Sequence, residues 1–282
     1  MKPILSIVIS TLLIGSACAS DAGRPNIVLI FADDLGWKDV GYQGSDFYET
    51  PNIDRLAKEG MVFTNAYAAA GNCQPSRACL LSGQYTPRHG VFAVGDTNRG
   101  PLKEMRLVPI PNVKGLADDN VTMAEALKAA GYATGIFGKW HLGQKPGVAP
   151  GKQGFDTVFQ SKAGWDANEE GNPKGIYSLT KAAGDFMEKN KDRPFFVYLP
   201  HYAIHTAHQA RPQTLERFKA KKPGEQHNDP LYAGCTYDLD DGVGILLKRI
   251  ADLGLEKNTL VIFTSDNGGF QKSSQEPLRG NK

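Results

Sequence analysis

Short apolar runs alternate with amphipathic helical patterns along this chain, and that alternation limits the folds open to it. The apolar runs are short and rich in β-branched residues, as expected for strands buried on both faces of a sheet. They predict strands at residues 26–32, 133–137, 195–199 and 259–264. Helical patterns, each closed by a glycine, predict helices at residues 51–59, 122–130 and 237–253. This order predicts an α/β fold with a mainly parallel, doubly wound sheet sandwiched by helices.

The charge balance excludes one class of partner. The 282 residues include 32 basic and 30 acidic side chains, for a net charge of +2. A nucleic-acid surface needs clustered excess basic charge, which this balance does not supply. With 41% hydrophobic residues, the chain can fill one large core or two modest ones. We expect a globular protein with no nucleic-acid partner.

The first residues have the pattern of an export signal. Lys2 precedes an apolar run at residues 4–14, and Ala17-Cys18-Ala19 forms an A-x-A-like cleavage site. We expect residues 1–19 to be a signal peptide, residues 20–282 to form the exported domain, and the protein to be periplasmic or secreted. A membrane anchor is disfavoured because the run is too short to span a bilayer comfortably. Lipid modification of Cys18 is a minor alternative, and no other stretch predicts a membrane span.

Three cysteines follow the signal: Cys73, Cys79 and Cys235. An odd number in an oxidising compartment leaves at least one thiol unpaired within the chain. A disulfide between Cys79 and Cys235 is possible, and the sequence leaves it open.

Polar residues follow four of the predicted strands. Folds of this class place their sites at the carboxyl ends of the strands, so these residues are candidates for one site. The candidates are Asp33, Asp34, Lys139, His141, His201, His205, His208, Asp266 and Asn267. Any one of them could instead be an ordinary turn or cap residue. Four strand ends of this kind together favour a functional site.

The oxygen-bearing candidates form a chemically coherent set. Asp33, Asp34 and Asp266 offer carboxylates, and Asn267 offers an amide oxygen. Hard divalent cations such as Ca²⁺ and Mg²⁺ take ligands of this kind, whereas zinc more often recruits His or Cys. We therefore expect a hard cation at this edge of the sheet.

A further candidate is the segment CQPSRACLLSG, residues 73–83. Pro75 fits the first turn of a helix that Gly83 ends, which places Cys73 just before the helix N-terminus. Free backbone N–H groups there bind anions and lower the pKa of a thiol. Arg77 opposes the helix dipole, and a locally unfavourable cation suggests function. The segment predicts a pocket for a tetrahedral oxyanion with a nucleophile at its floor; a buried cysteine at an ordinary helix is the alternative.

The same segment resembles the signature of the type I sulfatases, C-x-P-S-R-x-x-L-x-x-G, with Cys73 as its first residue. The blocks around Asp33-Asp34-Leu35-Gly36, Thr50-Pro51-Asn52-Ile53-Asp54, GKWHLG and Ser265-Asp266-Asn267-Gly268 are similar to family blocks in the same order. The resemblance covers nearly the whole mature chain. It implies the alkaline-phosphatase-like α/β sandwich and an arylsulfatase-like sulfuric ester hydrolase.

In that family a separate maturation enzyme oxidises the signature cysteine to formylglycine (3-oxoalanine). The resemblance implies this modification for Cys73, with Pro75 and Arg77 as part of the sequence that the enzyme reads. The hydrated aldehyde attacks sulfur through one hydroxyl and the alcohol leaves. The second hydroxyl then loses its proton, the C–O bond breaks, and sulfate is released as the aldehyde re-forms. The substrate implied is a sulfate ester, such as a sulfated polysaccharide or an aryl sulfate.

The resemblance also implies a role for each candidate residue. One Ca²⁺ would be held by Asp33, Asp34, Asp266, Asn267 and the modified Cys73. Arg77 and Lys139 would stabilise negative charge, and His141 would serve the second proton transfer. His205 and Lys282 would face the leaving oxygen and the sulfate. His205 is chosen because HTAH is similar to a family segment, although Ala207 replaces its usual proline. His201 and His208 are expected to be loop histidines without a catalytic role, and His89 and His227 stay unassigned.

The chain ends at residues 278–282, LRGNK, which is similar to the start of a further family block. Family members continue into another strand region and a smaller carboxy-terminal subdomain. The resemblance therefore implies that residues 20–282 are the family's N-terminal catalytic domain, truncated at its carboxy-terminal end. Two alternatives to an active sulfatase stay open: a related phosphomonoesterase or phosphodiesterase, and an inactive truncated protein.

Overall fold

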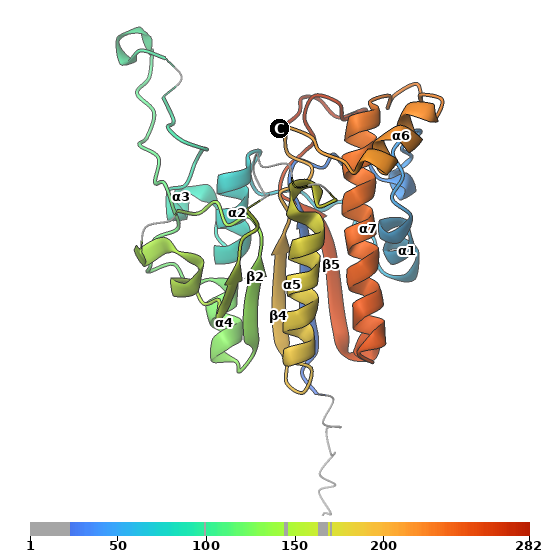
Figure 1. Cartoon of the computed structure of the whole chain (residues 1–282). Helices are drawn as coiled ribbons and strands as arrows, with labels where there is room; N and C mark the ends of the chain where they lie inside the picture. Colours follow the sequence, from blue (N-terminus) through green and yellow to red (C-terminus); the bar gives the residue numbers. More distant parts are fainter. Residues whose placement is uncertain (1–22, 99, 144–145, 163–168, 170) are drawn as a thin grey trace, which may run out of the picture.

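Parallel strands form one sheet with the order β3-β2-β4-β1-β5 in the computed structural model, which describes residues 23–98, 100–143, 146–162, 169 and 171–282 (Figure 1). The strands are β1 (Asn26–Ala32), β2 (Ala133–Phe137), β3 (Thr157–Phe159), β4 (Phe195–Pro200) and β5 (Thr259–Ser265). Every pairing in the sheet is parallel. The predicted fold class is confirmed. The predicted signal peptide and Cys18 lie outside the described residues.

The helices connect these strands and lie against the sheet. They are α1 (Pro51–Glu59), α2 (Cys73–Ser82), α3 (Thr86–His89), α4 (Met123–Ala129), α5 (Ile176–Lys189), α6 (Pro212–Ala220) and α7 (Pro230–Asp252). Short 3₁₀ turns lie at Gly41–Gln43, Leu102–Glu104, Pro146–Val148, Pro150–Lys152, Pro173–Gly175 and Glu256–Asn258. No helix in the described part of the chain combines the length and the apolar character that a bilayer crossing requires.

Most predicted elements agree with the structure within two residues, and α7 is the exception. The expected helix at 237–253 begins earlier, at Pro230. The Asp229 side chain accepts hydrogen bonds from the backbone N–H groups of Leu231 and Tyr232, which satisfies donors that a helix start leaves unpaired. Pro230 in the first turn lacks an N–H and fits that place.

Each face of the sheet has its own core. On one face, alternate strand residues such as Val28, Ile30 and Val197 pack with α5 and α7. On the other face, Leu29 and Phe31 join residues of α2 and α4. This alternation follows from the period of two along a strand, and it explains why the central runs read as continuously apolar.

β5 is an edge strand, and its two faces differ. It pairs with β1 on one side. Val261 and Phe263 pack against the core beside α7. Leu260 and Ile262 face the opposite way and are 52% and 38% exposed. The edge half of the sheet is thus covered on one face only within the described residues.

The described cysteines, Cys73, Cys79 and Cys235, are buried and free. Cys79 lies in α2 and Cys235 in α7. These helices pack on opposite faces of the sheet, so the disulfide that the sequence left open does not form.

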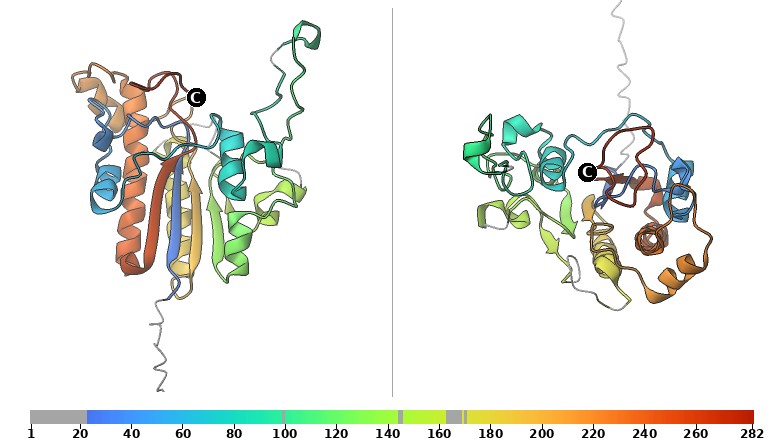
Figure 2. Two further views of the ribbon diagram at one scale, coloured as in Figure 1. Left: turned by 180° about the vertical axis from the view of Figure 1, so that it is seen from behind. Right: turned by 90° about the horizontal axis from the view of Figure 1, so that it is seen from above.

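The carboxyl ends of all the strands lie at one end of the sheet, where the C-terminus also lies (Figures 1 and 2). The N-terminus of α2 is at the same end (Figure 2). Parallel strands with helical crossovers require this arrangement, which gathers loops distant in sequence.

Candidate active site

The loop after β1 carries two aspartates and is held by the loop after β4. The backbone N–H of Asp33 donates to the carbonyl of Ala203 at 2.8 Å, and the N–H of Ile204 donates to the carbonyl of Asp33 at 2.7 Å. Asp34 takes a left-handed backbone conformation, with φ of 65°. This reversal turns the two carboxyls into a shared space at the end of the sheet.

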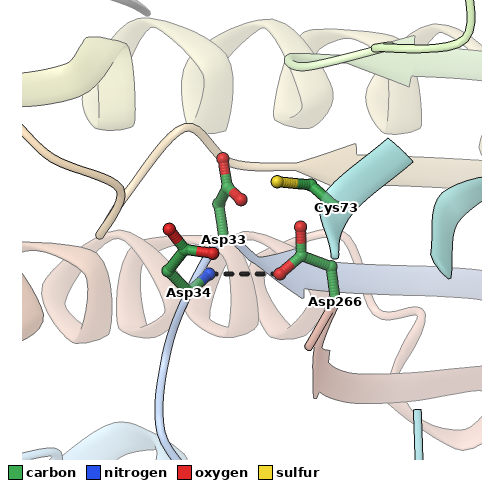
Figure 3. Close-up of side chains that lie close together, drawn as sticks. All are labelled: Asp33, Asp34, Cys73 and Asp266. Carbon is green, nitrogen blue, oxygen red and sulfur yellow. Dashed lines mark hydrogen bonds between the residues drawn. The ribbon is translucent and has the colours of Figure 1, made fainter. Parts of the chain in front are cut away.

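Three carboxylates and a thiol meet there. One ligand atom from each of Asp33, Asp34, Cys73 and Asp266 lies within 4.8 Å of the others, and all four residues are buried. Figure 3 shows the Cys73 thiol directed toward the aspartates, with the Asp34 N–H donating to Asp266. The structure therefore brings these four residues, from segments distant in sequence, to one place.

Asn267 completes the oxygen set. Its Nδ2 donates to Asp34 Oδ1 at 2.8 Å, while its buried Oδ1 has no hydrogen-bond partner among the described residues. A buried amide oxygen without a donor is costly unless something else satisfies it. Three carboxylates and this oxygen fit a hard divalent cation. A thiol is a poor ligand for such a cation, so Cys73 as an unmodified residue fits least.

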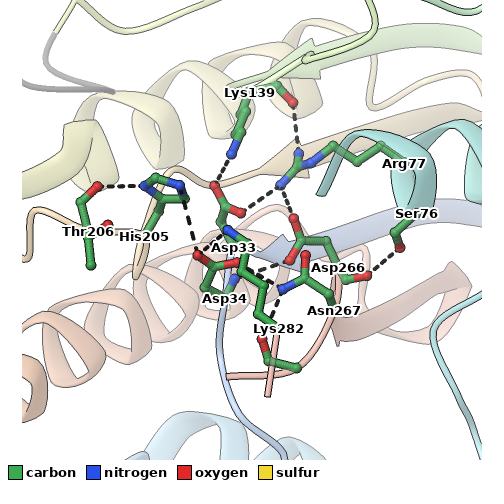
Figure 4. Close-up of polar contacts among 11 residues, drawn as sticks. Asp33, Asp34, Ser76, Arg77, Lys139, His205, Thr206, Asp266, Asn267 and Lys282 are labelled. Carbon is green, nitrogen blue, oxygen red and sulfur yellow. Dashed lines mark hydrogen bonds and ion pairs between the residues drawn. The ribbon is translucent and has the colours of Figure 1, made fainter. Parts of the chain in front are cut away.

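Arg77 and Lys139 lie on the side of Asp33 that faces away from Asp34 (Figure 4). The Arg77 guanidinium is fully buried; it donates to Asp266 Oδ2 at 2.9 Å and to the carbonyl of Lys139 at 2.9 Å. It also lies 3.5 Å from Asp33 Oδ1, and the Lys139 ammonium pairs with Asp33 Oδ2. One arginine therefore bridges the loops after β1 and β5.

Lys282 and His205 approach the cluster at Asp34 (Figure 4). Lys282 Nζ donates to Asp34 Oδ2 at 2.6 Å, and His205 Nε2 lies 3.9 Å from the same oxygen. The structure thus brings every predicted catalytic and metal-ligating residue to one end of the sheet. Among Asp33, Asp34, Asp266, Arg77, Lys139 and Lys282, three negative charges face three positive charges.

The two bridged carboxyls titrate differently. Burial raises the pKa of Asp266 to about 6, and the nearby Asp33 charge adds to the rise. Burial acts the same way on Asp33, but Lys139 and Arg77 outweigh it and hold its pKa below the usual range. Asp33 is therefore the more firmly ionised of the pair, because it has two close cations.

Cys73 lies within α2 rather than before it. The helix begins at Cys73, and Asn72 is its N-cap. Burial raises the pKa of the Cys73 thiol, so the expected acidification by the helix N-terminus is wrong for this residue. Desolvation disfavours the thiolate more strongly than the neighbouring lysines favour it. The Ser76 hydroxyl donates to the carbonyl of Asp266, which ties α2 to the loop after β5.

Gly138 sets the position of Lys139. Its φ is +132°, and a Cβ at this position would lie 2.0 Å from the carbonyl oxygen of Pro200. Lys139 N–H donates to that carbonyl at 2.7 Å, so the loop after β2 lies against the end of β4. Only glycine permits this close approach.

His141 and Lys139 line a cavity of about 300 Å³ that also contacts Gln74, Lys114 and Tyr202. Burial lowers the pKa of His141 to about 3, with Lys139 and Arg77 contributing. His141 is therefore neutral at physiological pH, when one ring nitrogen can accept a proton.

The other histidines differ in their surroundings. His201 lies in the loop directly after β4, as the sequence suggested, and is fully buried. Burial lowers its pKa to about 3. His208 packs against Tyr232, with 5.0 Å between the ring centroids. His89 contacts Cys79, and His227 lies between two aspartates.

The sequence did not point to the residues that support the loops after β1 and β5, chiefly Asp39, Tyr48, Tyr232 and His227. Asp39 lies six residues after Asp33, and its partners are distant in sequence. No local sequence pattern therefore indicated its supporting role. The available signal was the cluster of polar residues following the first strand.

Comparisons with known proteins agree with this geometry. The family model described as Sulfatase matches residues 25–282. A protein named Sulfatase from Formosa agariphila is 35% identical over 98% of this chain and 64% of its own length. The N-acetylgalactosamine-6-sulfatase of Mus musculus is 35% identical over 94% of this chain and 54% of its own length.

A solved structure gives the same result. The crystal structure of Ps i-CgsB in complex with k-i-k-neocarrahexaose superposes with a TM-score of 0.75 at 33% identity, covering 92% of this chain and 62% of that one. The chain therefore spans roughly half to two thirds of the proteins that it matches. A family match over nearly all described residues, together with the convergence of the signature cysteine and the aspartates, shows that the chain belongs to the sulfatase family.

Proposed function

We propose that the protein hydrolyses sulfate esters and releases inorganic sulfate, using one Ca²⁺ and a formylglycine made from Cys73. The observation that carries the proposal is the buried cluster of Asp33, Asp34, Asp266 and Cys73, whose ligand atoms lie within 4.8 Å of one another. Family membership supports the same reaction.

The calcium would be held by Asp33, Asp34, Asp266 and Asn267, with an oxygen of the modified residue 73 as a further ligand. The buried Asn267 Oδ1, which lacks a partner among the described residues, supports this ligand set. When bound, the ion would withdraw electron density from a sulfate oxygen and favour ionisation of a hydroxyl beside it. Lys282 now pairs with Asp34 and would have to share that carboxylate with the ion.

Residue 73 would supply the nucleophile. The proposal requires a maturation enzyme as a partner, because conversion of a thiol to an aldehyde is an oxidation at Cβ, for which that enzyme would supply the catalyst and the oxidant. The raised pKa of the Cys73 thiol supports this view, since an unmodified thiol here would be largely protonated at neutral pH. The hydrated aldehyde would supply two hydroxyls on one carbon.

The chain's own cations would stabilise the charge that develops on the sulfate. Arg77 is fully buried and its guanidinium is held by Asp266 and the Lys139 carbonyl, so it needs no reorganisation as charge develops. Lys139 would act on the same side through its ammonium group. His141, neutral because burial lowers its pKa to about 3, would accept a proton from a hydroxyl of residue 73.

His205 and Lys282 would face the leaving alcohol. Both approach the cluster from the Asp34 side, opposite Arg77 and Lys139 (Figure 4). From there His205 would donate a proton to the leaving oxygen, and Lys282 would bind a sulfate oxygen. A leaving alkoxide needs such a proton because it is strongly basic.

The alcohol part of the substrate is proposed to be a sulfated carbohydrate. The relatives' names, N-acetylgalactosamine-6-sulfatase and a complex with a neocarrahexaose, support this class. The cavity of about 300 Å³ beside Lys139 and His141 offers polar side chains, Gln74 and Lys114 among them, to such a group. A carbohydrate substrate accords with the proposed export by a signal peptide at residues 1–19 and with a catalytic domain at residues 20–282.

Two measurements on one preparation test the proposal. The chain is co-expressed with a formylglycine-generating enzyme, the Cys73 peptide is analysed by mass spectrometry, and matched aryl sulfate and aryl phosphate esters are assayed with and without Ca²⁺. We expect an aldehyde at residue 73 and calcium-dependent release of sulfate, both absent in Cys73→Ala. An unmodified thiol with no sulfate release, or faster hydrolysis of the phosphate ester, contradicts the proposal.

A further inference from the structure

We propose that His227 is a positioning residue that braces both loops carrying the proposed calcium ligands. It contacts none of those ligands and acts through Asp39, Asp46 and Tyr48. This inference rests on the proposed calcium site, and it assigns a purpose to a buried histidine that the reaction does not use.

His227 acts on the loop after β1, which carries Asp33 and Asp34, through Asp39. Asp39 is fully buried and lies five positions after Asp34. Asp39 Oδ2 accepts the backbone N–H of Gly36 at 2.9 Å and also the Tyr232 hydroxyl. The Asp39 N–H donates back to the Gly36 carbonyl at 3.1 Å. Asp39 therefore closes the turn that immediately follows the two aspartates, and α7 holds Asp39 through Tyr232.

His227 faces the other oxygen of Asp39 at ion-pair distance, without a hydrogen bond between them. Its Nε2 lies 3.5 Å from Asp39 Oδ1, and its Nδ1 lies 2.8 Å from Asp46 Oδ1. Both ring nitrogens thus face carboxylates, and only the imidazolium has a proton to donate at each. Burial lowers the pKa of His227, but Asp39 and Asp46 outweigh burial and raise it.

Asp46 anchors the histidine's own loop. Its carboxylate accepts the backbone N–H groups of Glu225, Gln226 and His227 at 2.7, 2.9 and 3.1 Å. These bonds lower the pKa of Asp46 to about 2 against the opposing effect of burial. The negative partner of His227 is therefore present throughout the neutral range.

Tyr48 connects His227 to the loop after β5, which begins with Asp266 and Asn267. Its ring lies 4.7 Å from the His227 ring and 4.7 Å from the Tyr232 ring, between centroids. Its hydroxyl donates to the carbonyl of Lys272 at 2.7 Å. Lys272 belongs to the loop that begins with Asp266 and Asn267, so one aromatic stack connects both ligand-bearing loops.

The two loops also touch each other. A Cβ at Gly269 would lie 2.9 Å from the Gly36 Cα, so the loop after β5 packs directly on the turn that Asp39 closes. A displacement of either loop would be transmitted to the other. The proposed ligand sets from β1 and β5 are therefore positioned as one unit.

Other charged groups near the brace define how it responds to pH. The facing groups are Asp39, Asp46, Tyr48, Asp229, Tyr232 and Lys272, with Lys272 Nζ 3.6 Å from Asp229 Oδ2 and His208 packed on the far side of Tyr232. Because the folded pKa of His227 is raised, its stabilising contribution is complete at low pH. That contribution is lost as pH rises through the folded pKa, when the imidazole loses its positive charge and its ion pairs with Asp39 and Asp46.

The test measures calcium affinity by isothermal titration calorimetry from pH 6 to pH 9. The proteins compared are the wild type, His227→Gln, Tyr48→Phe, and the control His89→Gln, which removes another buried histidine far from these loops. We expect wild-type affinity to fall at the alkaline end. His227→Gln should bind about tenfold more weakly at pH 6.5, equivalent to about 1.4 kcal/mol, and lose the alkaline fall. Tyr48→Phe should bind a few-fold more weakly, and His89→Gln should match the wild type.

The outcomes separate this inference from the proposed function. If the wild type binds Ca²⁺ and His227→Gln matches it at every pH, the brace is wrong while the calcium site stands. An equal loss in His89→Gln would mean general destabilisation, which also overturns the brace. If the wild type binds no Ca²⁺, the proposed site itself fails. Should His227→Gln not fold, Tyr48→Phe decides, because it keeps the ring and removes only the bond to Lys272.

Discussion

β1 and β5 are neighbours that each deliver two of the proposed metal ligands, yet they are held in different ways. β1 is central, pairs with β4 and β5, and is packed on both faces. β5 lies at the edge, with Leu260 and Ile262 52% and 38% exposed. The difference teaches that a buried strand positions Asp33 and Asp34 by packing, whereas Asp266 depends on polar contacts made to it from elsewhere.

Those contacts are few and specific. Asp34 N–H donates to Asp266 Oδ1 at 3.1 Å, Arg77 donates to Oδ2 at 2.9 Å, and the Ser76 hydroxyl donates to the backbone carbonyl. Arg77 also lies beside Asp33, so it joins the well-packed half of the site to the edge half. Substitutions at these contacts and in the two strands should therefore change stability and calcium affinity by different amounts.

The largest effect is expected for Arg77→Met, which removes the shared cation. Two buried carboxylates would lose a partner, and breaking a buried ion pair in this way typically costs about 3–5 kcal/mol. We expect a loss of that order in the free energy of unfolding, measured by urea denaturation. The control Arg217→Met removes a partly exposed pair with Glu49 and should cost about 1 kcal/mol or less. Equal losses in the two variants would show that Arg77 does not join the halves.

Next in size is a direct comparison of the strands themselves. Ile30→Ala in β1 opens a cavity in a fully buried position and should cost about 2–5 kcal/mol. Ile262→Ala in β5 removes a partly exposed side chain and should cost about 1 kcal/mol or less. Urea denaturation of both variants measures the difference. A cost for Ile262→Ala equal to that for Ile30→Ala would remove the distinction between centre and edge.

The smallest effect concerns the proton on Asp266. In the metal-free chain its pKa is about 6, so the folded state holds a proton at pH 5 that an unfolded aspartate does not. Its ionisation therefore costs stability as pH rises toward 6, and a bound cation must displace the proton below that pH. We expect calcium affinity to fall about tenfold between pH 7 and pH 5, by calorimetry. A fall that persists in Asp266→Asn would assign the proton to another group.

Much of this arrangement could be predicted from local sequence. The central strands are continuous apolar runs, and polar residues at their ends must meet because parallel strands share one carboxyl edge. That rule alone located Asp33, Lys139 and Asp266. The helix N-terminus at Cys73 followed from Pro75 and Gly83, although burial, which raises the thiol pKa, could not be read from the segment.

The residues that the sequence did not reveal act through distant partners. His227 meets Asp39 and Asp46 across about 180 residues of chain, and nothing near it in sequence marks its burial. β3, only three residues long, gave no periodic signal. The start of α7 is marked by Asp229-Pro230, a cap followed by a first-turn proline, whereas the amphipathic pattern that predicted the helix begins only at residue 237.

Gly138 carries no functional group, yet it limits how this protein can vary. Any side chain there would meet the Pro200 carbonyl and push Lys139 from its place. In a saturation library under growth selection, we expect codon 138 to accept as few replacements as the codons of the charged residues. A position outside the substrate contacts would thus have to stay glycine while other residues of the site change to give new specificities.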